Sequence, residues 1–134
     1  MRLSRYTDYA LRVLMYLAVH TDRQCSINEI AKAHRISENH LMKVVHDLGR
    51  AGFVTTQRGR GGGLKLARPA DQIRVGEVVR QTEQGLDLLD CGPCVLVSAC
   101  VLTGTLNEAM RAFIAVLDSR TIADMTAPGD RLRA

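Results

Sequence analysis

The sequence predicts a mainly α-helical fold with one small β-hairpin: a winged helix-turn-helix, followed by a cysteine loop and a long C-terminal helix. Three observations lead to it. Apolar residues recur at helical spacing between positions 7 and 51, two short β-prone runs then flank a glycine-rich segment, and a second helical pattern follows a cluster of cysteines. Of the 134 residues, 46% are hydrophobic and 24% charged, which is typical of a globular domain and excludes a disordered tail.

The first two helices are predicted from their start signals. Thr7 is the predicted N-cap of the first helix, which continues to about Thr21. Ser26 and Glu29 have the spacing of a capping box, which places the second helix over residues 27–34. The second helix is short.

A third helix follows after a tight turn. Ser37 is its predicted N-cap, and it continues to about Ala51, where Gly52 is suited to a left-handed C-cap. Its predicted buried stripe consists of Leu41, Val44, Val45 and Leu48.

A hairpin is predicted next. Residues 53–57 and 64–66 are β-prone and enclose the basic, glycine-rich tip 58–63. A short fourth helix over 75–82 follows a proline-started connector. The second and third helices, joined by a tight turn and followed by a basic hairpin, form the pattern of a winged helix-turn-helix, in which the second helix of the pair, here the third of the chain, enters the DNA major groove.

Charge divides the chain into a basic part, which contains the predicted helix pair and hairpin, and an acidic part that follows. Residues 23–68 contain nine basic and three acidic residues, a net charge of +6, whereas residues 69–134 carry a net charge of −3. A basic segment of this kind favours a polyanionic partner, although a solvated basic face is the commoner meaning of scattered lysines. With 4% aromatic residues, the chain has few platforms for stacking single strands, so duplex DNA is favoured over RNA.

The candidate DNA-binding residues lie at the start of the third helix and at the hairpin tip. Polar residues off the apolar stripe can reach base edges or phosphates, and their alternative roles are helix capping and solvation. Arginines beside glycines can approach a phosphate or the minor groove. The candidates are Ser37, Asn39, His40, Lys43, Arg58, Gly59, Arg60 and Gly61.

Three cysteines form a C-x2-C-x5-C loop: Cys91, Cys94 and Cys100. In a reducing compartment this clustering indicates a metal site rather than disulfides. Three soft thiolates suit an iron-sulfur cluster with one open position, and zinc is the alternative that the spacing leaves open. Cys25 lies far away and is predicted to be a small buried thiol.

The last helix is predicted over residues 103–118, a length of about 24 Å. Apolar residues spread around its far end, so one small body cannot cover it, and we expect it to pair across the two-fold axis of a homodimer. A dimeric helix-turn-helix protein is expected to bind a near-palindrome with half-sites about 34 Å apart, or a multiple of that.

Several segments together carry a resemblance to a known family. They are residues 1–12 (MRLSRYTDYALR), the triple glycine at 61–63, the three cysteines, and residues 113–118 and 121–125. The chain resembles the NsrR-type nitric-oxide-sensing repressors, a branch of the winged-helix iron-sulfur regulators that also include IscR and RirA. The resemblance covers about residues 1–126.

The resemblance implies a cofactor and a ligand set. IscR-like proteins have a histidine ligand shortly after the third cysteine, where this chain has Thr103, so a 2Fe-2S cluster is less expected than 4Fe-4S. In NsrR-like proteins an aspartate at the place of Asp8 completes the site from the opposite subunit. Arg12, four residues on, is then expected to pair with Asp8 beside the cluster, and a plain surface ion pair is the alternative. The two residues between Cys91 and Cys94 are fewer than the family usually has.

The expected function is transcriptional repression, with nitric oxide modifying the cluster and releasing operator DNA. The alternatives are a regulator that responds to iron or cluster status and, in another class, a small electron carrier or cluster donor. No spacing suggests a nucleophile and its base, so we do not expect an enzyme. No apolar run approaches the roughly 18 to 20 residues needed to span a bilayer, and no signal-peptide pattern is present, so we expect a cytoplasmic protein with no membrane partner. The expected domains are 1–82 (DNA binding), 83–102 (cysteine loop) and 103–134 (dimerisation helix and tail).

Overall fold

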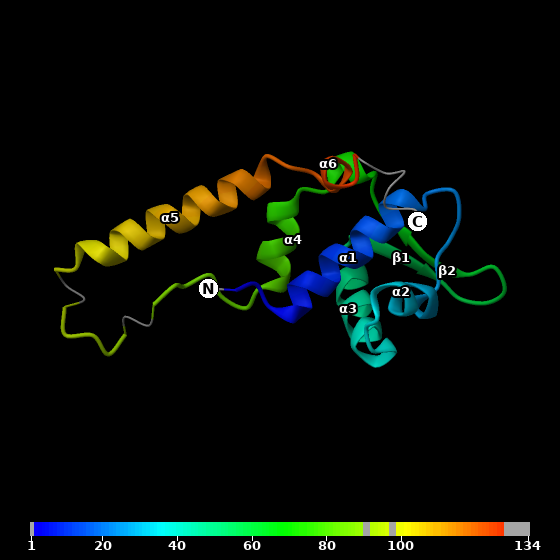
Figure 1. Ribbon diagram of the computed structural model, residues 1–134, viewed down its shortest axis with the longest axis horizontal. Coiled ribbons are helices and arrows are strands. Elements are labelled where there is room, and N and C mark those ends of the chain that lie inside the picture. The colour runs from blue at the N-terminus through cyan, green and yellow to red at the C-terminus, as the bar shows by residue number, and fades with distance from the viewer. Residues whose placement is uncertain (1, 90–91, 97–98, 128–134) are drawn as a thin grey trace.

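The computed structural model describes residues 2–89, 92–96 and 99–127. Its elements, in chain order, are α1 (Arg5–Val19), α2 (Ile27–His34), α3 (Glu38–Arg50), β1 (Val54–Gln57), β2 (Gly63–Leu66), a short 3-10 helix η1 (Ala70–Gln72), α4 (Val75–Thr82), α5 (Val101–Asp118) and α6 (Ile122–Met125). The predicted fold class is confirmed. Figure 1 shows α1 to α4 and the hairpin gathered at one end of the molecule, with α5 extending away from them.

The predicted N-cap of α1 is wrong. Ser4 caps the helix, because its side chain accepts the backbone N–H of Thr7 at 3.2 Å. Thr7 is instead fully buried one turn into the helix, where its hydroxyl is hydrogen-bonded to that of Thr82 at 2.8 Å. The helix also ends at Val19, two residues before the predicted Thr21.

The capping box of α2 is confirmed. Ser26 Oγ accepts the N–H of Glu29 at 3.0 Å, and the Glu29 carboxylate accepts the N–H of Ser26 at 2.7 Å. Glu29 also pairs with Arg23, and hydrogen bonds from Arg23 and from the Ser26 N–H lower the pKa of Glu29 to about 2. The first helix of the helix-turn-helix therefore begins at a fixed position. Its predicted bounds agree with the structure.

Helix α3 ends as predicted. Gly52 has a φ of +85°, and the Phe53 N–H reaches back to the Leu48 carbonyl oxygen at 2.9 Å while the Gly52 N–H bonds the Gly49 carbonyl at 3.2 Å. This is a Schellman ending, which turns the chain sharply into the hairpin. Ser37 occupies the N-cap position of α3 as predicted, but its side chain makes no capping hydrogen bond. The four predicted stripe residues of α3 are all buried.

Strand β2 of the hairpin forms backbone hydrogen bonds on both of its sides. Strand β1 runs antiparallel to β2, with Val54 opposite Leu66 and Gln57 opposite Gly63. On the other side of β2, the Cys25 N–H donates to the Leu64 carbonyl at 3.0 Å and the Leu64 N–H donates to the Cys25 carbonyl at 2.7 Å. The connector before α2 thus acts as a third strand for one residue pair. Cys25 is a buried free thiol, as predicted.

Helix α5 begins two residues before the predicted start and ends at Asp118 as predicted. Its C-terminal end packs on α4, where Arg80 pairs with the Asp118 carboxylate. The lack of a side chain at Gly76 permits this contact, since a Cβ there would lie 2.0 Å from Asp118 Oδ1. None of the helices in the described ranges is long and apolar enough to cross a bilayer.

We predict that Gly63→Ala destabilises the fold. A Cβ at this position would lie 2.6 Å from the backbone carbonyl oxygen of Cys25, and the φ of +153° is unfavourable for any L side chain. The expected loss in the free energy of unfolding is about 2 kcal/mol, measured by urea denaturation.

Gly104→Ala is the matched control, because Gly104 lies in α5 and a Cβ there would meet no other described segment of the chain within 4 Å. Alanine favours a helix, so this change should leave stability unchanged or raise it by up to about 1 kcal/mol. Equal stabilities of the two variants would contradict the importance of the close approach at Cys25.

Candidate nucleic-acid interface and cysteine loop

An exposed polar stripe runs along α3 opposite its buried face. Asn39 and Lys43, two of the predicted DNA-binding residues, lie on it one turn apart. His46 and Arg50 continue it at seven and eleven residues from Asn39, and all four side chains are exposed. We call these four residues the outer stripe. Sequence reasoning missed His46 and Arg50, although their helical spacing from Asn39 was the signal that could have found them.

The other two predicted residues of this segment lie elsewhere. The structure places the exposed His40 on the flank of α3 that faces α1, with its ring centroid 6.5 Å from that of Tyr9. Ser37 is exposed just before the helix begins. The structure therefore brings only Asn39 and Lys43 onto one face of α3.

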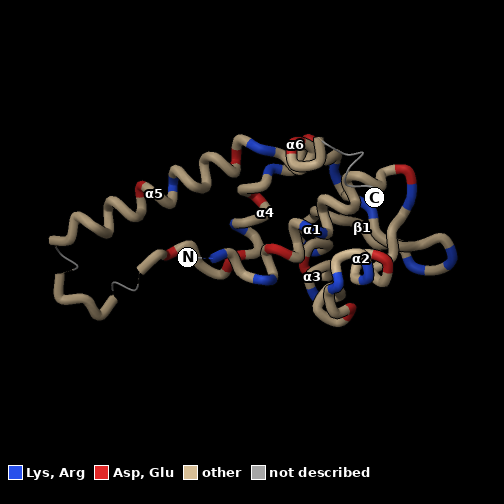
Figure 2. The backbone as a smooth tube through the Cα atoms, in the orientation of Figure 1, with Lys and Arg blue, Asp and Glu red and all other residues tan. Residues whose placement is uncertain are grey.

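The hairpin tip is basic and exposed. Arg58, Gly59, Arg60 and Gly61 all face solvent, and the turn is closed by a hydrogen bond of 3.0 Å from the Gly62 N–H to the Gly59 carbonyl oxygen. Neither arginine forms an ion pair within the part of the chain that the structure describes. Figure 2 shows basic residues at this tip and along α2 and α3. Unpaired guanidinium groups on a protruding turn are suited to contact phosphates.

The start of α1 carries an exposed carboxylate. Arg12 Nε donates to Asp8 Oδ1 at 2.8 Å, and the two side chains are 46% and 47% exposed, so the predicted pair between them is present. Among the residues described, none donates a hydrogen bond to Asp8 Oδ2. That oxygen is available to bind a metal ion or to accept a hydrogen bond.

Two of the three loop cysteines lie within the described ranges. Cys94 is exposed, and Cys100 occupies the N-cap position of α5. The backbone N–H and the hydroxyl of Thr103, with the N–H of Leu102, lower the pKa of the Cys100 thiol. Cys91 lies outside the described residues. Within those residues, no three His, Cys, Asp or Glu side chains gather as a metal site in one chain.

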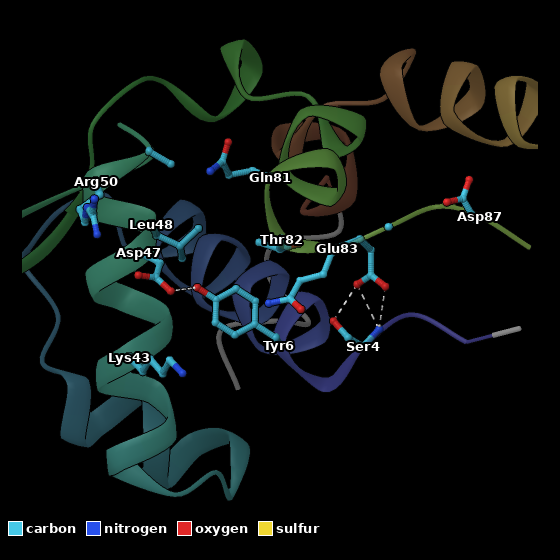
Figure 3. A pocket seen from close by; sticks show the side chains of 13 residues that line it. Ser4, Tyr6, Lys43, Asp47, Leu48, Arg50, Gln81, Thr82, Glu83 and Asp87 are labelled. Atoms are coloured by element: carbon cyan, nitrogen blue, oxygen red, sulfur yellow. Dashed lines mark hydrogen bonds between the residues drawn. The ribbon is translucent and has the colours of Figure 1, made fainter. Parts of the chain in front are cut away.

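A cleft of about 770 Å³ separates the start of α1, the second half of α3 and the segment after α4 (Figure 3). On one side, Glu83 accepts hydrogen bonds from the Ser4 N–H and from the Ser4 and Thr7 hydroxyls. Burial alone would raise the pKa of Glu83, but these hydrogen bonds outweigh it and lower the pKa.

On the other side of the cleft, the Tyr6 hydroxyl donates to Asp47 Oδ2 of α3. Burial and the neighbouring carboxylate raise the pKa of Tyr6, so the phenol stays protonated and remains the donor. The first turn of α1 is therefore bonded both to α3 and to the chain that leaves α4.

Comparison with known proteins identifies the family of the chain. A family model described as Rrf2, an iron-dependent transcriptional regulator, matches residues 3–128. The chain belongs to the Rrf2 family. Among its relatives, the HTH-type transcriptional regulator NsrR of Shouchella clausii is 44% identical over 140 aligned positions that cover 100% of this chain and 94% of the relative. NsrR of Bacillus subtilis is 46% identical over 131 positions, covering 93% and 90%.

Solved structures of the Rrf2 family agree. IscR of T. potens has a TM-score of 0.82 at 27% identity and covers 100% of this chain and 92% of its own. CymR, the global cysteine regulator of Bacillus subtilis, has a TM-score of 0.75 at 25% identity, covering 95% and 97%. These relatives are transcriptional regulators, so the chain is a DNA-binding regulator and not an enzyme. They also argue against the electron-carrier alternative.

We predict that Arg60→Ala weakens binding to any duplex. Loss of one phosphate contact should lower the slope of log affinity against log salt concentration by about one unit, without changing the preferred sequence. Fluorescence anisotropy with a random-sequence duplex over a salt series measures this slope. Arg111→Ala, which removes the same charge from α5, is the control and should leave the slope unchanged. Equal slopes for both variants would remove the hairpin tip from the interface.

Proposed function

We propose that this protein is a cytoplasmic transcriptional repressor that senses nitric oxide through a 4Fe-4S cluster, and that nitrosylation of the cluster releases operator DNA. The relatives named NsrR support the proposal, as does the cysteine loop. The single observation that carries it is the position of Cys100 at the N-cap of α5, where the N–H groups of Leu102 and Thr103 favour the thiolate, the form of cysteine that binds iron.

The proposed ligands are Cys91, Cys94, Cys100 and Asp8 of the partner subunit. The donors within the described ranges fit such a group in their chemistry: Cys94 is exposed, Cys100 favours its thiolate, and Asp8 keeps one oxygen free of hydrogen bonds. A 2Fe-2S cluster fits less well because no histidine follows Cys100. Arg12, already paired with Asp8, would offset negative charge at the site.

The proposed assembly is a homodimer formed through α5. No residue of this helix is buried, and apolar side chains such as Leu102 and Val116 are 54% and 62% exposed. Such a surface favours a second copy of the helix. In this division, residues 1–82 bind DNA, 83–102 hold the cluster and 103–134 dimerise. Two copies of α3 would then read the halves of a near-palindromic operator.

The bound cluster supplies iron that reacts with nitric oxide. Of the proposed ligands, Asp8 is the weakest, because a carboxylate is a harder donor than a thiolate. Loss of its contact with iron would free the first turn of α1, which touches α3 through Tyr6, and Tyr9 in the next turn lies beside His40. A shift of α3 that lowers operator affinity tenfold needs only about 1.4 kcal/mol.

A second candidate function is regulation by iron or by cluster status with the same residues. The iron-dependent description of the matching family favours it. The two candidates differ in the signal that derepresses the target genes, which is nitric oxide in one case and iron starvation in the other.

We predict that anaerobically purified protein binds operator DNA and loses affinity as nitric oxide is added. The loss should be tenfold or more once the cluster is fully nitrosylated, as measured by mobility shift alongside visible spectra. Unchanged affinity through complete nitrosylation would refute nitric oxide sensing. A colourless, sulfide-free anaerobic preparation would refute the cluster itself.

We predict that Asp8→Ala changes the Mössbauer spectrum of the cluster, because one iron loses its oxygen ligand. Asp22→Ala, an exposed aspartate in the connector after α1, is the control and should leave the spectrum unchanged. Identical spectra for both variants would assign Asp8 only to its ion pair with Arg12.

A further inference from the structure

Helix α3 carries one carboxylate between two of the cations on its outer stripe. Asp47 follows Lys43 by four residues and precedes Arg50 by three, the spacings at which helix side chains are neighbours. All three residues line the cleft described above (Figure 3). Nevertheless, in the part of the chain that the structure describes, Asp47 forms no ion pair with either cation.

The partner of Asp47 comes from another helix. Tyr6, in the first turn of α1, donates its hydroxyl hydrogen to Asp47 Oδ2. A neutral phenol donates a hydrogen bond to the carboxylate oxygen and leaves the charges of nearby cations unchanged. An ion pair between the carboxylate and one of those cations would instead neutralise the positive charge of that cation. Because the phenol ring is rigid and partly buried, it fixes the carboxylate on the side of α3 that faces α1.

The remaining cations are thus left available. Lys43 and Arg50 are exposed, and neither is paired with an acidic side chain among the residues described. Positive charges on a groove-binding helix act on DNA by neutralising phosphates and releasing counterions, so each charge that is withdrawn weakens binding to every sequence.

We propose that Tyr6 is a positioning residue that holds the Asp47 carboxylate away from Lys43 and Arg50, so that α3 presents both cations to DNA phosphates. This inference rests on the proposed function in one respect, since it takes α3 as the helix that contacts DNA. Without the phenol hydroxyl, the carboxylate finds its nearest charged partner one turn away on the same helix. The resulting ion pair removes one cation from the DNA-binding surface.

The test compares the full-length protein with Tyr6→Phe, Asp47→Asn and the double variant. The probe is a random-sequence duplex, with affinity measured by fluorescence anisotropy over a salt series. Tyr6→Phe should bind several-fold more weakly, and its salt slope should be smaller by about one unit. Asp47→Asn should keep the wild-type slope. The double variant should match Asp47→Asn, because no carboxylate is left to pair.

Tyr16→Phe is the matched control. It makes the same change on the same helix and removes a hydrogen bond of 3.1 Å to a carboxylate, but that carboxylate is Glu29 of α2, which is already paired with Arg23. Its salt slope should equal that of the wild type. Urea denaturation of each variant identifies any loss of folding.

Two outcomes overturn the inference. One concerns Tyr6→Phe: either its salt slope equals that of the wild type, or it lowers the slope in the Asp47→Asn background as much as in the wild-type background. The other needs no change at Tyr6: a slope larger by about one unit in Asp47→Asn alone would show that Asp47 already neutralises a cation. Failure of the wild-type protein to bind any duplex would instead contradict the proposed function.

Discussion

The first turn of α1 is the constraint on which the arrangement of the molecule depends. Ser4 and Thr7 are hydrogen-bonded to Glu83, where the chain leaves α4 toward the cysteine loop. Tyr6, between them in the sequence, is hydrogen-bonded to α3. Asp8 follows directly and projects its carboxylate outward. Neighbouring residues of this one turn are hydrogen-bonded to α3 and to the segment after α4. The positions of α3, of that segment and of Asp8 are therefore linked through the turn.

In the proposed function, this arrangement explains how a change at the exposed carboxylate of Asp8 reaches α3, the helix proposed to contact DNA. No long route through the core is needed, since Tyr6 is two residues from Asp8 and already touches α3. Coupling of this kind needs a hydrogen bond that can be made or broken and a rigid element that moves with it. The phenol of Tyr6 and helix α3 have these two properties.

The sequence predicted the elements whose signals are local. The capping box at Ser26, the left-handed Gly52 and the bounds of α4 depend on residues a few positions apart, and all agree with the structure. The start of α1 could not be decided in this way. Ser4 and Thr7 both have cap chemistry, and one of the contacts that hold Ser4 in place comes from a residue 79 positions away.

In the candidate site, too, some features follow from local sequence signals and others depend on distant contacts. The exposed face shared by Asn39 and Lys43 follows from helical spacing, and the exposed arginines of the hairpin tip follow from the glycine-rich turn, whereas the position of His40 beside α1 depends on packing that no local pattern encodes. The Tyr6–Asp47 contact joins residues 41 positions apart and was not foreseen. The proposed cluster ligands come from two chains, so no pattern within one chain could show that they meet.

The backbone pairing of Cys25 with Leu64 has a mechanical consequence for the hairpin. A β-ribbon attached only through its two ends would swing about its base and lose that freedom on meeting a ligand. Here Leu64, in the second strand pair from the tip, is tied to the connector that leads into α2, so only positions 58–62, between the paired strands, are left to adjust. The angle between the arginine-bearing tip and the helix pair is set before any encounter, which limits the conformational entropy lost on association to that short turn.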